Sequence, residues 1–227
     1  MTSRYTTIFF DLDHTLLDSH ASEQAAFAQT MQSIGVVASP STFETYDRIN
    51  QGLWRRVEAG ELSPNDVKVL RFERMLTELG VDGDPVAMGA TFVQGLAGNG
   101  ELYRGALDVL DAVRAVARLA MITNGIGWVQ RGRIERLGLG DYFEQISISG
   151  ELGMSKPRRD IFDHTLTEMQ LTDRSRVLMV GDNLGSDIAG AHNAGIDSAW
   201  FNPNGSVAGD VVPTHTVSSL ADLTLLI

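Results

Sequence analysis

The sequence contains no cysteine, so neither a disulfide framework nor a thiolate metal site can form. It also lacks any apolar run near the ~18 to 20 residues that a membrane-spanning helix needs. Residues 1–10 hold one arginine and a short apolar run that leads directly into acidic residues, a pattern typical of a buried strand rather than a signal peptide. These absences argue against a membrane partner and predict a cytoplasmic protein.

Positive charge is scarce as well. The 227 residues carry 18 lysine and arginine side chains against 29 aspartate and glutamate side chains, a formal net charge of −11. No long basic run is present, so a nucleic acid polymer is not an expected partner. A small anionic ligand stays possible if cations gather locally.

Short runs rich in β-branched and aromatic residues recur along the chain and predict β-strands. These runs are residues 6–10, 119–122, 146–149, 177–180 and 199–201, with a weaker one at 214–217. From the second run onward, segments with apolar residues at helical spacing separate them, for example Leu107, Leu110 and Val113. Apolar strands alternating with helices predict an α/β fold built on a doubly wound parallel sheet.

The stretch between the first two predicted strands is different, because it contains no convincing strand. Apolar residues such as Phe27 and Met31 repeat there at helical spacing, and Ser63 followed by Pro64 predicts the start of a helix. We therefore expect an all-helical cap domain inserted into an α/β core. The expected cap is residues 17–97, and the expected core is residues 1–16 and 98–227.

Polar side chains follow each of the first four predicted strands. The groups are Asp11 to Thr15, Thr123 to Gly125, Lys156 with Pro157, and Asp182 with Asp187. Ligands of open parallel sheets bind beyond the carboxyl ends of the strands, so these groups are expected to meet. Several carboxylates in one partly desolvated cleft repel one another and need compensating positive charge. Mg²⁺, which prefers carboxylate, water and phosphate oxygens, and the Lys156 ammonium would supply it.

The order of these motifs resembles the four signature motifs of the haloacid dehalogenase-like hydrolase superfamily. The matching residues are Asp11-x-Asp13-x-Thr15, Thr123, Lys156 before a proline, and Gly181-Asp182 with Asp187. The resemblance covers essentially the whole chain, including the helical cap and the closing stretch from Phe201 onward. It implies a magnesium-dependent phosphomonoester hydrolase that works through an aspartyl-phosphate intermediate.

Chemistry and resemblance together suggest a role for each residue. Asp11 is the expected nucleophile, since a carboxylate is ionised at neutral pH and needs no activating base. Asp13 is expected to protonate the leaving alkoxide and then to activate water, because alternate residues of an extended segment share a side. Thr123, the backbone near Asn124, and Lys156 are expected to bind the phosphoryl oxygens.

The metal ligands are expected to come from the same strand ends. They are Asp11, Asp13 through its backbone carbonyl, Asp182 and Asp187. Asp187 either binds through water or orients Lys156. Plainer readings also exist, in which Asp182 caps a helix, Asp187 is an exposed helical acid and Lys156 is a solvated loop cation. His14, between the motif acids, is expected to be a packing or loop residue, because an acid already fills the role of base.

Asp13 also separates subclasses of the superfamily. Dehalogenases lack this second aspartate and transport ATPases carry threonine there, so its presence indicates a phosphatase or a phosphomutase. Residues 18–23, 50–54 and 123–130, with Trp200-x-Asn202-Pro203, resemble the pyrimidine 5′-nucleotidase branch, which implies a nucleoside monophosphate as substrate. In this interpretation Asn50 hydrogen-bonds one edge of the base and Trp54 stacks on it. Both are otherwise ordinary residues of a cap helix.

Two departures from the pattern of that branch bear on the substrate. Arg104 stands where proline is common, and Arg158 and Arg159 follow Lys156-Pro157 where acidic residues or proline are usual. These extra cations are candidates for altering substrate preference. Two alternatives therefore stay open: a sugar-phosphate or phosphoglycolate phosphatase or phosphomutase of the same fold, and a non-catalytic protein that binds a phosphorylated ligand and has no need of Asp13.

Overall fold

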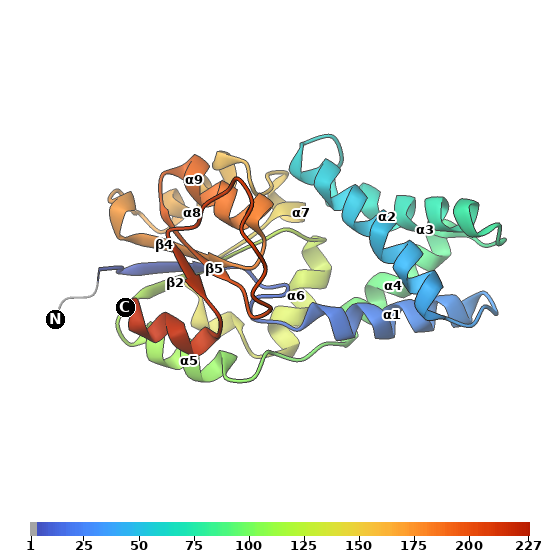
Figure 1. Cartoon of the computed structure of the whole chain (residues 1–227), viewed down its shortest axis with the longest axis horizontal. Helices are drawn as coiled ribbons and strands as arrows, with labels where there is room; N and C mark the ends of the chain where they lie inside the picture. The colour runs from blue at the N-terminus through green and yellow to red at the C-terminus, as the bar shows by residue number, and fades with distance from the viewer. Residues whose placement is uncertain (1–3) are drawn as a thin grey trace.

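Six parallel strands form one sheet in the computed structural model, which describes residues 4–227 (Figure 1). Residues 1–3 of the predicted core lie outside this range. The strands are β1 Thr7–Phe10, β2 Arg118–Thr123, β3 Gln145–Ile148, β4 Val177–Gly181, β5 Asp197–Phe201 and β6 His215–Val217. Their order is β3-β2-β1-β4-β5-β6, so the direction of winding reverses between β1 and β4. The doubly wound parallel sheet is confirmed, and the predicted strand ends shift by no more than two residues.

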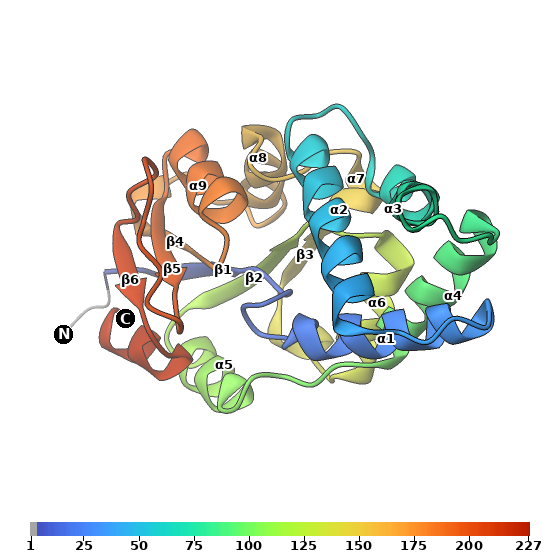
Figure 2. The ribbon, with the colours of Figure 1, turned by 45° about the vertical axis from the view of Figure 1, so that its right-hand side comes forward.

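Helices cover both faces of the sheet, and β1 is therefore buried on both (Figure 2). Ile8 and Phe10 belong to an apolar core with α5 and the C-terminal η4, whereas Phe9 belongs to a second core with α8 and α9. Successive side chains of a strand point to opposite faces, which is why this strand reads as a continuous apolar run. The bounds are α5 Ala106–Arg114, α6 Gly127–Arg136, η1 Gly140–Tyr142, α7 Ser149–Leu152, α8 Arg159–Glu168, η2 Arg174–Arg176, η3 Leu184–Ile188, α9 Ala189–Ala194 and η4 Leu220–Leu225.

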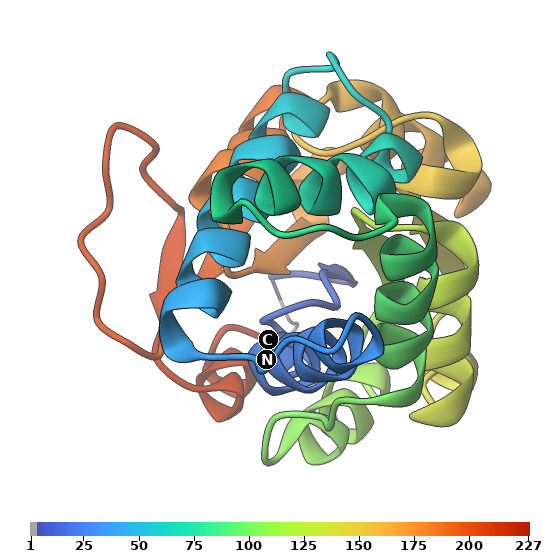
Figure 3. The same ribbon diagram turned by 90° about the vertical axis from the view of Figure 1, so that its right-hand side faces the viewer.

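Four further helices form a separate layer beyond one end of the sheet, seen face-on in Figure 3. They are α1 Ser19–Ser33, α2 Pro40–Glu58, α3 Pro64–Leu79 and α4 Pro85–Gly98, and they pack around an apolar core of their own. The predicted N-cap is confirmed, since Ser63 and Asp66 cap the start of α3 reciprocally. We refer to α1–α4 as the helical layer.

Two chain segments join the sheet to the helical layer, and they run side by side. Leu17 and Leu102 form a bridge, and the backbone N–H of Asp18 donates to the oxygen of Glu101 at 2.9 Å. Helix α6 follows β2 and contributes Ile126 and Val129 to the core of the helical layer. Within residues 4–227, no helix has both the length and the apolar character needed to cross a bilayer.

Candidate active site

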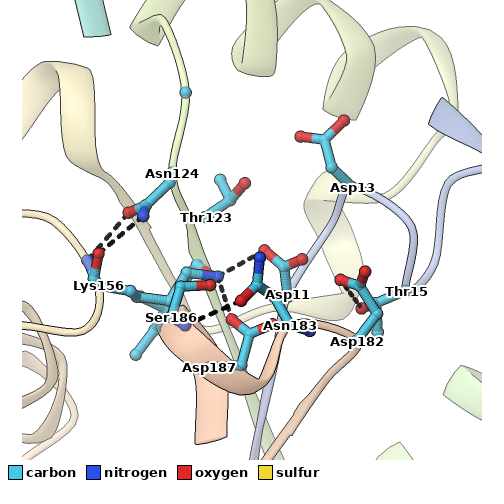
Figure 4. Close-up of polar contacts among 12 residues, drawn as sticks. Asp11, Asp13, Thr15, Thr123, Asn124, Lys156, Asp182, Asn183, Ser186 and Asp187 are labelled. Atoms are coloured by element: carbon cyan, nitrogen blue, oxygen red, sulfur yellow. Dashed lines mark hydrogen bonds and ion pairs between the residues drawn. The ribbon is translucent and has the colours of Figure 1, made fainter. Parts of the chain in front are cut away.

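The carboxyl ends of three strands bring a lysine and three aspartates into one group, in which Asp182 is half-buried and the other three residues are buried (Figure 4). The ammonium of Lys156 lies 2.6 Å from Oδ1 of Asp11 and 2.6 Å from Oδ1 of Asp187. The contact with Asp187 has the distance of an ion pair without the directionality of a hydrogen bond. The ammonium also donates to the backbone oxygen of Ile122 at 2.8 Å. Lys156 is 1% exposed and Asp187 is fully buried, so water screens these charges little.

This group is short of positive charge. Asp11, Asp182 and Asp187 each place a carboxylate oxygen within 4.8 Å of the others, and Lys156 is the cation among them. Burial, with the charges of neighbouring carboxylates, outweighs the attraction of Lys156 and holds the pKa of Asp11 well above its usual range. Burial and the charge of Asp187 raise the pKa of Asp182 to about 7. Oxygen donors of this kind fit a hard divalent cation, which would lower both pKa values.

Lys156 itself stays charged in this setting. Burial alone would lower the pKa of its ammonium, but the carboxylates of Asp11 and Asp187 outweigh burial and raise the pKa. Asn124 holds the lysine backbone from both sides: its Nδ2 donates to the oxygen of Lys156 at 2.9 Å, and its Oδ1 accepts from the N–H at 3.0 Å. Asn124 therefore fixes the backbone position from which the Lys156 side chain reaches Asp11 and Asp187.

The turn after β4 brings Asp187 back beneath Asp11. Asn183 caps the short helix η3, since its Oδ1 accepts from the backbone N–H groups of Gly185 and Ser186. Oδ2 of Asp187 accepts from the N–H of Asn183 at 3.0 Å. A side chain on residue 181 would meet the Asp187 carboxylate at 2.3 Å, so this close return requires Gly181.

The side chain of Asp13 points away from the group and into a separate set of partners (Figure 4). Its Oδ1 accepts from Nη1 of Arg133 at 2.7 Å and from the Ser19 hydroxyl, and its Oδ2 accepts from Nε2 of Gln130 at 2.7 Å. Burial alone would raise the pKa of Asp13, but Arg133 and these hydrogen bonds outweigh it and lower the pKa. Arg133 also donates to the backbone oxygen of Leu96, so it ties Asp13 to the helical layer.

Of the predicted phosphate-binding residues, Asn124 and Lys156 line the cavity and Thr123 does not. Asn124 lines the cavity above the strand ends. Thr123 is fully buried, and its hydroxyl accepts from Nε2 of Gln130 at 2.8 Å instead of facing the cavity. Thr123 thus lies behind the site and supports the glutamine that holds Asp13.

A cavity of about 620 Å³ separates the strand ends from the helical layer. Helix α2 lines it with residues at helical spacing, which are Asp47, Asn50, Gln51, Trp54, Arg55 and Glu58. The predicted substrate residues Asn50 and Trp54 therefore lie on the cavity wall, opposite Asp11. His14 lines the cavity too, in a left-handed backbone conformation with φ +58°.

The arginines that depart from the nucleotidase pattern lie elsewhere. Arg158 and Arg159 are exposed and pair with Asp160 and Asp163 on the surface, outside the lining of the cavity. Arg104 is also outside that lining. The expectation that these cations alter substrate preference gains no support from their position.

Sequence reasoning missed six charged residues that the structure places at the cavity, namely Glu23, Asp47, Arg55, Glu58, Arg71 and Arg133. Each lies in a helix, where a charged residue is read as part of the solvated face. A signal was available for Arg133, because it lies three residues after Gln130 on the helix that follows Thr123, and that spacing puts both on one face. No comparable spacing marks Glu23 or Arg71.

Known proteins share both the sequence and the fold. The haloacid dehalogenase-like hydrolase family matches residues 5–195. Pyrimidine 5′-nucleotidase YjjG of Escherichia coli is 37% identical, over 99% of this chain and 98% of its own length. Pyrimidine 5′-nucleotidase PynA of Streptococcus pneumoniae is 34% identical, over 96% and 93%. The crystal structure of HAD-hydrolase YfnB from Bacillus subtilis, bound to magnesium, superposes with a TM-score of 0.91 at 30% identity, over 98% and 99%. This chain therefore belongs to the haloacid dehalogenase-like hydrolases.

Proposed function

We propose that this protein is a magnesium-dependent phosphatase that hydrolyses phosphate monoesters through an aspartyl phosphate on Asp11. The observation that carries the proposal is the charge-deficient group of Asp11, Asp182, Asp187 and Lys156 at the floor of the cavity. Membership of a hydrolase family, and relatives named as nucleotidases and phosphatases, support the same reaction class.

The proposed metal ligands are Asp11, the backbone carbonyl of Asp13, Asp182 and Asp187. When bound there, Mg²⁺ supplies the positive charge that keeps Asp11 ionised and neutralises the transferring phosphoryl group. A buried lysine and the carboxylates around it form a preorganised electrostatic site, in which charges need little reorientation during the reaction.

The proposed reaction has two steps. An oxygen of Asp11 attacks phosphorus while the bond from phosphorus to the leaving oxygen breaks, and Asp13 gives that oxygen a proton. Asp13, now ionised, takes a proton from water, and the resulting hydroxide attacks the phosphorus and releases Asp11. Lys156 neutralises phosphoryl oxygens in both steps. The lowered pKa of Asp13 favours the carboxylate that the second step needs over the protonated acid that the first step needs.

The proposed substrate is a pyrimidine nucleoside 5′-monophosphate. Support comes from the two pyrimidine 5′-nucleotidases that match the chain almost end to end, and from a cavity that extends beyond the strand ends to polar and aromatic side chains of α2. The proposed cap is residues 17–97, which would open and close over the site about the paired segments at Leu17 and Leu102. The YfnB structure is described as revealing interdomain movement, which is compatible with such a hinge.

Phosphate release from a panel of monoesters tests the proposal. The panel would hold UMP, dUMP, dTMP, CMP, AMP, GMP, glucose phosphates, phosphoglycolate and p-nitrophenyl phosphate, each with Mg²⁺ and with EDTA. We expect Mg²⁺-dependent release that is strongest on pyrimidine monophosphates and abolished by Asp11→Asn. Strongest release from a sugar phosphate or phosphoglycolate would keep the reaction and overturn the nucleotide assignment. Retained activity in Asp11→Asn would overturn the nucleophile.

A further inference from the structure

The helical layer contributes a buried cation to the cavity that the proposed chemistry does not use. Arg71 of α3 is 2% exposed and yet belongs to the cavity wall. Its Nε donates to the backbone oxygen of Val67 at 3.0 Å and its Nη1 to the hydroxyl of Tyr46 at 3.1 Å. The guanidinium lies 5.0 Å from the centroid of the Phe92 ring. All of these partners are neutral, and within residues 4–227 no carboxylate forms an ion pair with Arg71.

A buried guanidinium held only by neutral groups retains donor capacity for a ligand. It carries five N–H donors, and the two hydrogen bonds to Val67 and Tyr46 use two of them. A cation is costly to bury unless acceptors surround it, so a ligand acceptor in the cavity would meet a strong, charge-assisted donor.

An orphaned amide lies on the same wall. Asn50 follows Tyr46 by one turn of α2, is 4% exposed and lines the cavity. Its Oδ1 is enclosed and accepts no hydrogen bond in the described part of the chain. Buried polar atoms are nearly always paired, so an unpaired oxygen beside a cavity points to a ligand donor. Tyr46, which accepts from Arg71, lies one turn before Asn50 on α2, so the unpaired amide and the cationic donor belong to the same wall of the cavity.

We propose that Arg71 and Asn50 form the subsite that recognises the base of the substrate, an inference that rests on the proposed nucleotidase function. Arg71 donates to a ring carbonyl, and Asn50 accepts from a neighbouring ring N–H. The ligand class is a neutral heteroaromatic ring that carries a carbonyl beside an N–H. The side chains of Leu96, Ile126 and Val129, which also line the cavity, give the faces of such a ring apolar contact.

The charges around the subsite favour a neutral group over a second anion. Glu23 and Asp47 line the cavity as well, and burial together with the charges of both raises the pKa of Tyr46, the partner of Arg71. Burial raises the pKa of Glu23 although His14 and Arg71 oppose this. A second phosphate or a carboxylate on the substrate would meet these acids as well as the arginine. A carbonyl oxygen gains the hydrogen bond of the arginine without that repulsion.

Asn50→Leu separates this role from a structural one. Leucine has nearly the same shape and removes an unpaired buried amide, so the ligand-free variant should melt at or above the temperature of the wild type. Its ratio of kcat/KM for UMP to kcat/KM for p-nitrophenyl phosphate, which offers no base edge, should fall about tenfold, the size of one lost hydrogen bond. Asn65→Leu, at an exposed position of α3 outside the cavity, is the matched control and should leave both the ratio and the melting temperature unchanged.

Arg71→Met is the second variant, and its ratio should fall about a hundredfold, because a charge-assisted bond is lost. The result that overturns the subsite is a wild type active on UMP whose ratio is unmoved in Asn50→Leu. A phosphoglycolate rate that falls more than the UMP rate in Arg71→Met overturns it too, since the arginine would then bind an anion. A wild type that hydrolyses p-nitrophenyl phosphate and no nucleotide keeps the proposed phosphatase reaction but overturns the proposed nucleotide substrate, and the subsite with it.

Discussion

Removing the Lys156 ammonium should lower the free energy of unfolding, because three carboxylates would then repel one another without the cation that lies among them. Methionine matches the lysine chain in length and apolar character, so Lys156→Met deletes the charge with little change of volume. The change leaves Asp11 and Asp187 without the cation that lies 2.6 Å from each. Breaking a buried ion pair by removing one partner destabilises a protein by about 3–5 kcal/mol. Since folded domains are stable by only about 5–15 kcal/mol, this loss is large.

The size of that loss should depend on pH. Lys156 lowers the pKa of Asp11 and of Asp182, so its removal raises both pKa values further above those of the unfolded chain. Where the folded state binds more protons than the unfolded state, the free energy of unfolding falls as pH rises. Protonation relieves the repulsion at low pH, so the deficit of the variant should be smaller at pH 5 than at pH 8.

Urea denaturation in EDTA at these two pH values measures the deficit, and Lys68→Met is the matched control, since the sequence holds only these two lysines. Mg²⁺ binds the folded state and should restore part of the stability, about 2.7 kcal/mol at a hundred times its Kd. Phosphate release should fall about a hundredfold or more in Lys156→Met. A variant within about 0.5 kcal/mol of wild type at pH 8 without Mg²⁺, the scale of an ordinary surface substitution, would refute the charge argument.

Three further variants probe the rest of the site. Asp13→Asn should lower kcat by about 10²–10⁴ with little change in KM, because acid and base are lost together; steady-state kinetics that show a change mainly in KM would contradict this. Arg133→Met should raise the pKa of Asp13, which acts as the acid in the first step, and so move the alkaline limb of the kcat/KM pH profile to higher pH, whereas an unmoved limb would argue against their coupling. In EDTA, the free energy of unfolding of the wild type should fall as pH rises from about 4 to about 7, because Asp182 in the folded state holds a proton that the unfolded chain releases. Urea titrations of Asp182→Asn should show a smaller dependence of this free energy on pH.

The position of the site could be predicted from the sequence because a parallel sheet gathers the carboxyl ends of its strands at one edge. Asp11 directly follows β1 and Lys156 follows β3 in the loop after α7, and although they are 145 residues apart they meet at 2.6 Å at this edge. The apolar runs that mark these strands are strong signals, since both faces of the sheet are buried. The apolar runs therefore predict where the strands lie, and the polar residues that follow them predict where the site lies.

The directions of side chains could not be predicted in the same way. Asp13 and Thr123 both turn toward Gln130 of α6, and a rotamer that depends on a helix packed from elsewhere leaves no trace in a local pattern. The ion pair of Asp13 and Arg133 could not be predicted for the same reason, because the two residues are separated by 120 positions in the sequence. Arg71 is buried because Tyr46 and Phe92 enclose it, whereas helical spacing alone assigns a charged residue to solvent.

Charge balance explains why the two aspartates of the first motif, two residues apart, have separate partners. Asp11, Asp182 and Asp187 carry three negative charges against one on Lys156, and the remaining charge of −2 equals the charge that one divalent cation neutralises. Asp13 is balanced separately by Arg133, at 2.7 Å. If the Asp13 carboxylate joined the metal group, the site would need further positive charge and the acid would lose its freedom to exchange a proton. Arg133 therefore keeps the Asp13 side chain away from the ion that its backbone carbonyl is proposed to bind, and it favours the carboxylate form that acts as base in the proposed second step.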